Sequence, residues 1–481
     1  MANIVDVLNS YIWSNYLIGL CLLVGCYFSL RTRFLQVRHI KEMVSLMFEG
    51  KPSASGVSSF QALTLSLSGR VGTGNIAGVA SAITFGGPGA VFWMWAVAFL
   101  GASTAYVEAT LAQIYKEKED GQYRGGPAYF IEKGMGQKWY AMIFAFATII
   151  GAGLLLPGVQ ANSIASGVEH AFGISTSVTG AAVTVALGLI IFGGIKRIAS
   201  FAEVVVPFMA LGYIIVAIII IAMNVEQLGS VFALIFKSAF NMEAGFGAVI
   251  GLAVQWGVKR GIYSNEAGQG TAPHAAAAAE VSHPAKQGLV QGFSVYVDTL
   301  FVCTATALMI LLTGAYNVVN PAGGFLVENL KGVEAGPGYT QMAVETLLPG
   351  FGDAFVAIAL LFFAFTTIIA YYYIAETNVT YITNRLRLPG LSLLLRVVLM
   401  GAVFYGSIKS ASVAWGMGDV GVGIMAWLNI IAILIMQRPA LLALKDYEAQ
   451  RKQGLNPVFR PSKLGIKNAE FWDERVDADK Q

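Results

Sequence analysis

The chain has 481 residues, of which 56% are hydrophobic and only 12% are charged, and its formal net charge is +3. Soluble globular domains carry roughly 25% charged residues, so this composition excludes an ordinary soluble enzyme and a disordered scaffold. The sequence has no cluster of basic residues that would indicate nucleic acid as a partner. The 54 glycines are typical of membrane helices, in which small residues let backbones pack closely.

The first predicted membrane span covers residues 11–30, a charge-free stretch without the basic start and cleavage site of a signal peptide. A span needs about 20 mostly apolar residues, and ten further apolar segments approach or exceed this length. They cover residues 62–84, 88–113, 139–168, 174–195, 203–224, 244–276, 287–314, 351–377, 390–408 and 411–436. The sequence therefore predicts an all-α polytopic membrane protein with about 11 spans.

Three segments lie outside these spans. Polar and apolar residues alternate from His39 to Phe48, which predicts an interfacial helix before the second span. Residues 315–350 are rich in glycine and proline and predict either a lid-like loop or an ordinary connecting loop. The tail beyond Arg438 mixes nine basic with seven acidic residues, which is typical of a solvated segment.

The basic residues test this arrangement of spans independently, because cytoplasmic loops retain Lys and Arg. Of the 31 basic residues, 24 fall on one side of the predicted membrane and three on the other. The N-terminus is therefore expected outside and the C-terminus inside. Four basic residues fall inside or at the edge of spans: Arg70, Lys259, Arg260 and Arg396.

The second span contains four glycines between Ser68 and Ala80, at positions 69, 72, 74 and 78. Each glycine costs about 1 kcal/mol relative to alanine inside a helix, so the helix is expected to unwind there. Close packing of helices through small residues is the alternative interpretation. Unwound backbone is tolerated in a bilayer where it is buried in protein or lines a cavity, so unwinding predicts a binding site.

The seventh span contains a second glycine-rich stretch from Gln255 to Ala279. Glycines 257, 261, 268 and 270 are expected to interrupt this helix, and Lys259, Arg260 and Glu266 add charge. Paired broken segments in the two halves of a bundle are typical of an inverted-repeat transporter with a midplane site. If the first span is set aside, ten spans remain, five in each repeat. Because five is an odd number, the second repeat enters the membrane from the side opposite to the first.

Broken helices offer free backbone groups to ligands. The amides at a half-helix N-terminus can bind a carboxylate, and the carbonyls can coordinate Na⁺ or receive an ammonium group. Asn75 offers a donor and an acceptor at this depth. Gln160 is either a substrate contact or part of a buried interhelical hydrogen bond. Thr366 and Thr367 either face the break or bond back to their own helix.

Three motifs carry a resemblance to a known family: residues 72–102, residues 259–275 and residues 363–373. They resemble the alanine or glycine:cation symporters, bacterial and archaeal inner-membrane carriers that couple uptake of small neutral amino acids to Na⁺ or H⁺. The likeness extends over nearly the whole chain. It implies the leucine-transporter (LeuT) fold, a 5+5 inverted repeat, here with one additional N-terminal transmembrane helix.

The resemblance also implies which residues bind the ligands. The substrate-binding residues would be Thr73, Gly74, Asn75, Gln160, Trp256, Gly261 and Ile262. A sodium ion between the first and eighth core helices would be bound by the hydroxyls of Thr366 and Thr367 and by main-chain carbonyls near Ser68 and Val71.

These inferences give the chain four parts. An N-terminal span and interfacial helix (1–60) precede the first five-helix repeat (61–225), the inverted second repeat (240–437) and a cytoplasmic tail (438–481). Arg70, beside the first unwound segment, is expected to pair with a membrane carboxylate such as Glu108, Glu266 or Glu376.

Together with the broken helices, the resemblance implies a secondary active transporter, not an enzyme, in the bacterial inner membrane. It would take up alanine, glycine or both by alternating access, with Na⁺ or H⁺ as the coupling ion. Membrane lipid is the other expected partner, and no obligatory protein partner is evident. An ion channel without substrate coupling is the alternative, and it would show conductance without substrate.

Overall fold

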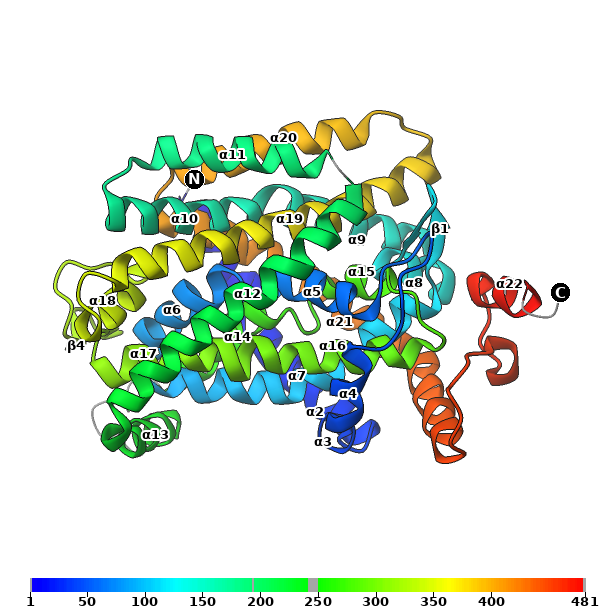
Figure 1. Cartoon of the computed structure of the whole chain (residues 1–481), viewed down its shortest axis with the longest axis horizontal. Coiled ribbons are helices and arrows are strands. Elements are labelled where there is room, and N and C mark those ends of the chain that lie inside the picture. The colour runs from blue at the N-terminus through cyan, green and yellow to red at the C-terminus, as the bar shows by residue number, and fades with distance from the viewer. Residues whose placement is uncertain (1, 193, 241–249, 479–481) are drawn as a thin grey trace.

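Residues 2–192, 194–240 and 250–478 are described by a computed structural model, and they are mostly helical (Figure 1). The helices of the first half are α1 (Ala2–Ile12), α2 (Asn15–Arg31), α3 (Leu35–Arg38), α4 (Ile40–Met47), α5 (Ser59–Arg70), η1 (Gly74–Gly78), α6 (Val79–Gly86), α7 (Gly89–Ile114), α8 (Pro127–Met135), α9 (Lys138–Ile150), η2 (Gly151–Leu155), α10 (Leu156–Phe172), α11 (Thr176–Ile191), α12 (Gly194–Met223) and α13 (Val225–Ala239).

The second half continues this helical architecture. Its helices are α14 (Ile250–Asn265), α15 (Ala272–Ala277), α16 (Pro284–Val295), η4 (Tyr296–Cys303), α17 (Thr304–Thr313), α18 (Pro337–Leu347), α19 (Gly352–Leu386), α20 (Leu391–Ser407), α21 (Ala411–Lys452), η5 (Pro461–Leu464) and α22 (Glu470–Ala478). Within the described residues, two antiparallel hairpins pair β1 (Glu117–Glu119) with β2 (Gln122–Arg124) and β3 (Asn317–Val319) with β4 (Phe325–Glu328).

Seven stretches of the described residues are long and apolar enough to cross a membrane: Ile4–Arg31, Gly89–Ile114, Lys138–Phe172, Arg197–Met223, Pro284–Thr313, Gly352–Leu386 and Ala411–Lys452. The shorter apolar helices α11 and α20 occupy two further predicted spans. The segments α5–η1–α6 and α14–α15 occupy the two spans predicted to be interrupted. The predicted polytopic helical membrane protein is confirmed, although residue 193 and the start of span 244–276 lie outside the described residues.

The helices run mainly along the long axis of the molecule and form two packed groups (Figure 1). Helix α7 packs against α14 and α16, while α10 packs against α19, α20 and α11. Helix α5 contacts α12, α15 and α19. The interrupted segments therefore lie among other helices, where their freed backbone groups can find protein partners.

The outer face of α11 and α12 is apolar. Val185, Leu189, Phe208 and Leu211 are all more than 60% exposed. Exposed apolar surface of this extent marks a membrane-facing region. These side chains are therefore suited to lipid, in agreement with the predicted spans.

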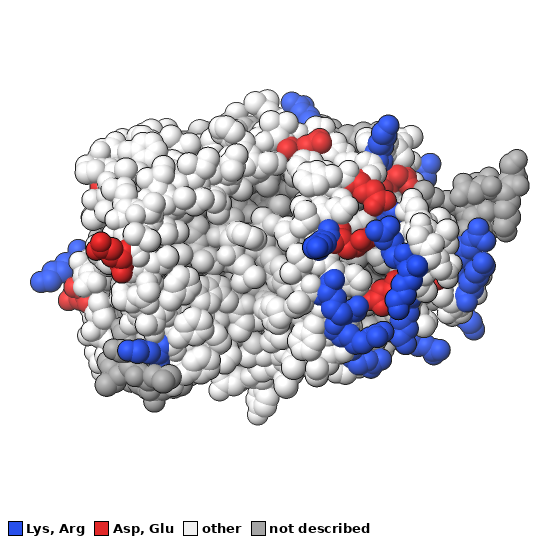
Figure 2. Space-filling model, turned by 60° about the horizontal axis from the view of Figure 1, so that its bottom comes forward, with Lys and Arg blue, Asp and Glu red and all other residues white. Residues whose placement is uncertain are grey.

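Charged residues gather at one end of the molecule. Figure 2 shows Lys and Arg concentrated at the end where α4 and α8 lie, while the face in view is almost free of charge between the two ends. At this end Arg385 of α19 contacts three carboxylates, those of Glu117, Glu119 and Glu132, at 2.7 to 3.1 Å. These ion pairs join the β1–β2 hairpin and α8 to the end of α19.

The loop and the tail have more structure than their composition indicated. Residues 315–350 contain β3, β4 and α18. Helix α21 continues through the predicted boundary at 438 as far as Lys452. The chain then returns to the helical body, where the Trp472 Nε1–H donates to the Gln113 carbonyl at 2.8 Å and the Trp472 side chain is buried.

Candidate functional site

The first interrupted helix breaks at Val71 and Gly72. Helix α5 ends at Arg70, Val71 has non-helical torsion angles (φ −77°, ψ 88°), and the chain enters the π-helical turn η1 at Gly74. The break is therefore shorter than the predicted stretch from Ser68 to Ala80. The backbone around it is fully buried, so its free amides and carbonyls require partners within the protein.

Two amide side chains supply partners for the freed N–H groups. The Asn75 Oδ1 accepts from the Gly72 N–H at 2.8 Å, and the Gln160 Oε1 of α10 accepts from the Thr73 N–H at 3.0 Å. The Thr73 hydroxyl is buried without a hydrogen-bond partner. The structure therefore brings Thr73, Asn75 and Gln160 together at the break, and a ligand that enters would compete for the same backbone donors.

The second interruption lies between α14 and α15. Glu266, Gly268 and Gly270 all have positive φ angles, between 58° and 84°. Glycine adopts this region without steric cost, whereas Glu266 does so against the usual preference of L-residues. The break is confined to residues 266–271, next to the end of α14.

Two of the glycines expected to interrupt this helix lie within the continuous helix α14. A Cβ at Gly257 would overlap the Ala90 carbonyl oxygen of α7, and a Cβ at Gly261 would overlap the Val97 side chain. The prediction that Gly257 and Gly261 interrupt the helix is wrong, because both serve close packing of α14 against α7.

The other predicted α14 residues, Trp256 and Ile262, make apolar contacts. Trp256 stacks on Phe85 of α6, with 4.6 Å between ring centroids, and Ile262 is buried in the core. The α14 residues that approach Gly74 are instead Ser264 and Tyr263, since a Cβ at Gly74 would lie 3.2 Å from the Ser264 Cα and 3.2 Å from the Tyr263 ring. The two interrupted helices therefore meet at Gly74 and Ser264, and neither Trp256 nor Gly261 lies at that contact.

A cluster of oxygen atoms lies on the α19 side of the first break. The Thr367 hydroxyl lies 2.8 Å from the Ser68 carbonyl oxygen, 3.4 Å from that of Val71 and 2.9 Å from that of Phe363. Thr367 is fully buried. One hydroxyl proton can serve only part of this set, so the cluster has surplus oxygen lone pairs, which suit a hard cation.

Thr366 faces a different neighbour. Its hydroxyl donates to the Phe363 carbonyl at 2.9 Å and lies 3.9 Å from the Met209 sulfur of α12. The structure thus brings Thr367 to Ser68 and Val71 and directs Thr366 away from them. The difference arises because adjacent residues of a helix point about 100° apart.

Sequence reasoning missed Asp298 of the π-helical segment η4. The Asn75 Nδ2–H donates to the Asp298 Oδ1 at 2.7 Å, the Ser264 hydroxyl donates to the same oxygen at 3.1 Å, and the Thr299 hydroxyl donates to Oδ2 at 2.7 Å. The Asp298 carboxyl is fully buried. An ionisable residue inside a membrane span is itself a signal of function, and Asp298 stands alone as an acidic residue in the predicted span 287–314.

Arg70 does not form the expected ion pair. Its guanidinium donates to the Gln291 carbonyl at 3.2 Å and to the Ser294 hydroxyl, while Nε and Nη2 have no hydrogen-bond partner. Within the described part of the chain, no carboxylate lies within 4 Å of it. The prediction of a direct pair is therefore wrong, although Arg70 is buried within electrostatic range of Glu266, Glu108 and Asp298.

The three expected partners have other contacts. Glu376 pairs with Arg124 at 2.7 Å, and Glu108 accepts from the Gly268 N–H at 3.1 Å. The Glu266 carboxyl lies against the backbone of Gly69. Glu266 therefore lies within electrostatic range of Arg70 but does not form a hydrogen bond with it.

A buried layer of charged and aromatic side chains lies beside the two breaks. Asp419 of α21 accepts from Arg260 at 2.7 and 3.1 Å and pairs with Lys259 at 2.7 Å. The Arg260 guanidinium lies 4.5 Å from the Trp415 ring, and this ring contacts Tyr263 at 5.0 Å. The layer joins α14 to α21.

A cavity of about 300 Å³ lies on the α18 side of this layer. Trp415 lines it together with Asn162 and Ser163 of α10, residues 332–336 of the loop before α18, and Pro337 and Gly338 of α18 itself. The Trp415 ring also approaches η1, because a Cβ at Gly78 would lie 3.6 Å from it. Trp415 thus borders the cavity and also approaches η1.

The family model described as the sodium:alanine symporter family matches residues 1–461. The chain is 58% identical over 432 residues to the sodium/proton-dependent alanine carrier protein of Bacillus sp. (strain PS3), covering 90% of this chain and 97% of that protein. It is 37% identical over 462 residues to the sodium/alanine symporter AgcS of Methanococcus maripaludis, covering 94% and 98%.

One solved structure bears on the fold. A crystal structure of the manganese transporter of Eremococcus coleocola has a TM-score of 0.51 and 12% identity, covering 87% of this chain and 94% of that chain. At this identity the likeness concerns the fold alone. The family model spans nearly the whole chain and confirms the resemblance of the sequence motifs, so the chain belongs to the sodium:alanine symporter family.

Proposed function

We propose that this chain is a secondary active transporter that takes up alanine, and glycine with it, together with Na⁺. The family supports this function, since relatives are named as sodium- or sodium/proton-dependent alanine carriers. The observation that carries the proposal is the buried cluster of Thr367, Ser68 and Val71 oxygens beside a helix break whose N–H groups are held only by two side-chain amides. A cation and a zwitterion would thus bind on either side of the same break.

The amino acid would bind at Thr73, Gly74 and Asn75, with Gln160 opposite. Its carboxylate would replace the side-chain acceptors that now hold the Gly72 and Thr73 N–H groups. Its ammonium group would lie near the acceptor oxygens of Asn75 and Asp298. The contact between Gly74 and Ser264 leaves little room there, which favours a small side chain; Trp256, Gly261 and Ile262 would then shape the site from further away.

Na⁺ would bind between Thr367 and the carbonyl oxygens of Ser68, Val71 and Phe363. These neutral oxygens suit a hard monovalent cation. In this arrangement Thr366 is not a ligand. The Asp298 carboxylate would balance positive charge in the centre of the protein, either that of the cation or that of a proton that replaces it.

The proposed fold is the LeuT type, with two inverted repeats of five helices at 61–225 and 240–437, an additional N-terminal span and interfacial helix within 1–60, and a tail at 438–481. The two interrupted segments, α5–η1–α6 and α14–α15, support this fold. Each would cross the membrane once, so that together with the seven long spans and the two shorter apolar helices they give eleven crossings. Residues 241–249 lie outside the described part of the chain.

The proposed location is the bacterial inner membrane, with the N-terminus outside and the C-terminus in the cytoplasm. The concentration of Lys and Arg at one end of the molecule supports this orientation (Figure 2). The cavity beside α18 would then face outward, and the layer of Asp419, Arg260 and Trp415 would close the route from it to Gly74. Movement of this layer is the conformational step that alternating access requires.

Uptake of radiolabelled alanine into proteoliposomes tests the proposal. Uptake should follow an inward Na⁺ gradient and grow with an inside-negative potential, because one charge moving through 100 mV gains about 2.3 kcal/mol. Separate vesicles with a pH gradient alone would identify proton coupling. Uptake that ignores both gradients would reject coupled symport, and conductance in a planar bilayer without amino acid would favour the ion channel.

A further inference from the structure

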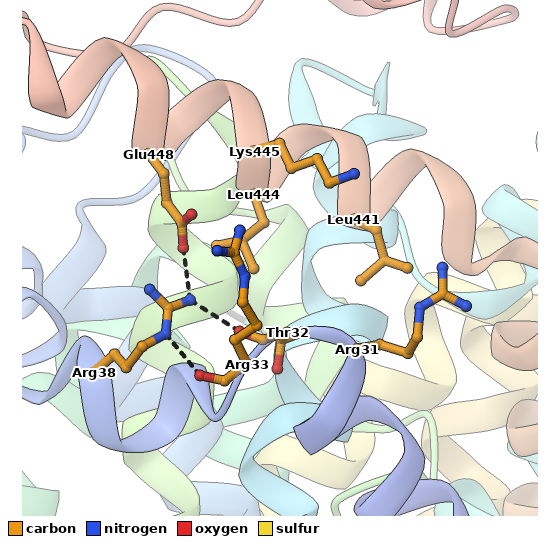
Figure 3. A pocket seen from close by; sticks show the side chains of 8 residues that line it. All are labelled: Arg31, Thr32, Arg33, Arg38, Leu441, Leu444, Lys445 and Glu448. Atoms are coloured by element: carbon orange, nitrogen blue, oxygen red, sulfur yellow. Dashed lines mark hydrogen bonds and ion pairs between the residues drawn. The ribbon is translucent and has the colours of Figure 1, made fainter.

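A small basic pocket lies apart from the proposed transport site, at the end of the molecule where Lys and Arg gather. It has a volume of about 90 Å³ and lies between the end of α2, the short helix α3 and the last turns of α21 (Figure 3). Arg31, Arg33, Arg38 and Lys445 line it, together with one acidic residue, Glu448. Four cations thus surround one carboxylate.

The one carboxylate is already engaged. Glu448 pairs with Arg38 at 2.8 Å and contacts His39 at 2.9 Å. Arg31 donates to the Tyr27 hydroxyl at 2.6 Å. In the described ranges, no carboxylate lies within 4 Å of Arg31, Arg33 or Lys445, so these three cations leave the pocket with positive charge that a ligand can neutralise.

The backbone adopts an unusual conformation at one of these cations, Arg33. Arg33 and Phe34 have φ angles of 55° and 52°, in the left-handed region that residues other than glycine rarely adopt. Arg38 holds this turn, because its Nε–H donates to the Arg33 carbonyl at 2.7 Å and its Nη2–H to the Thr32 carbonyl at 2.9 Å. The turn directs the Arg33 side chain toward α21 (Figure 3). Strain held in this way is an indication of function.

Exposed apolar side chains are neighbours in the chain of the arginines that line the basic pocket. Leu30, Phe34 and Val37 are 60%, 40% and 52% exposed. Helix α2 belongs to the apolar stretch Ile4–Arg31 that is long enough to cross a membrane, so its last turn lies where the apolar region ends. A ligand that fits this place has an anionic group for the arginines and apolar chains for the neighbouring surface.

We propose that the basic pocket binds the phosphate of an anionic phospholipid head group, with the acyl chains along Leu30, Phe34 and Val37. Arginine suits phosphate because its planar guanidinium donates two parallel hydrogen bonds. Basic pockets between membrane helices on the cytoplasmic side bind such head groups in other proteins. A bound lipid would link the additional N-terminal helix to α21.

Native mass spectrometry of the full chain in mixed micelles tests this site. The probe is phosphatidylglycerol, compared with phosphatidylcholine and with inorganic phosphate. The pocket variant replaces Arg31, Arg33 and Lys445 by Gln, and a matched control replaces the exposed residues Lys41, Lys452 and Lys467 by Gln, so that both variants lose three charges. A single Arg33→Gln variant serves if the triple variant does not fold.

Wild-type protein and the control variant should retain one tightly bound phosphatidylglycerol. At about fivefold in affinity per basic residue, the pocket variant should bind it about a hundredfold more weakly, and Arg33→Gln about fivefold. Equal affinity of the pocket and control variants for phosphatidylglycerol would overturn the proposal. So would wild-type protein that binds phosphatidylcholine equally well, or inorganic phosphate that displaces the lipid at equal concentration.

Discussion

Replacement of Thr367 by alanine removes the side-chain oxygen of the proposed sodium site and leaves its carbonyl oxygens in place. In the structure this hydroxyl lies within 2.9 Å of the Ser68 and Phe363 carbonyl oxygens. A hydrogen-bonding group that contacts a charge contributes about 1.5–3 kcal/mol. Since about 1.4 kcal/mol corresponds to a factor of ten, the variant should bind Na⁺ about 10- to 100-fold more weakly.

The assay is alanine uptake into proteoliposomes at graded external Na⁺, with the half-saturating Na⁺ concentration as the readout. Thr366→Ala is the matched control, because it removes the same group one position earlier, where the hydroxyl faces Met209 and not the break. Its half-saturating Na⁺ concentration should remain close to that of the wild type. Thr367→Ser keeps the hydroxyl and should restore most of the affinity.

The Na⁺ dependence of the two alanine variants decides the assignment. An unchanged half-saturating Na⁺ concentration in Thr367→Ala would show that this hydroxyl is not a ligand. An equal shift in both variants would point to a general disturbance of α19, and the local argument from the Thr367 contacts would fail.

Three further variants test other parts of the site. Gly72→Ala should abolish alanine binding measured by equilibrium dialysis, because the added methyl group would overlap the Thr367 hydroxyl; binding near the wild-type level would contradict the proposed substrate position. Asp298→Asn keeps the size of the side chain that contacts Asn75 but removes its charge, so alanine uptake should lose much of its dependence on Na⁺ and pH gradients; an unchanged dependence would exclude a role for this charge in coupling. Asp419→Asn leaves the two basic partners on α14 uncompensated, and because breaking a buried pair costs about 3–5 kcal/mol, the melting temperature in detergent should fall; a melting temperature like that of the wild type would show that the ion pairs contribute little to stability.

The glycines show what sequence reasoning could and could not predict. The cluster of glycines in the second span correctly located the first helix break, and the cluster in the seventh span located the segment that contains the second break. Inside that segment, Gly268 and Gly270 provide positive φ angles, whereas Gly257 and Gly261 let α14 approach α7. Both uses produce the same pattern in a single sequence, because close packing depends on a partner helix that the local pattern does not specify.

Charged residues show a similar division. The sequence indicated that the charges within spans needed partners, since charge is costly in hydrocarbon. It did not indicate which partners, because pairing depends on how each helix is rotated. Arg260 pairs with Asp419 of α21, 159 positions away in the chain. Arg70 contacts a carbonyl and a hydroxyl of α16 and, among the described residues, no carboxylate. Asp298 was detectable as a lone acidic residue in a span, but its contact with Asn75 required the fold.

The geometry of the first break gives a physical reason for coupling between cation and amino acid. The carbonyl of Val71 faces Thr367, while the N–H groups of Gly72 and Thr73, the next two residues, face Asn75 and Gln160. A cation on one side and a carboxylate on the other would therefore bind consecutive peptide groups of one short segment. Each ligand would fix the torsion angles that the other needs, and by linkage each would raise the affinity for the other by the same factor.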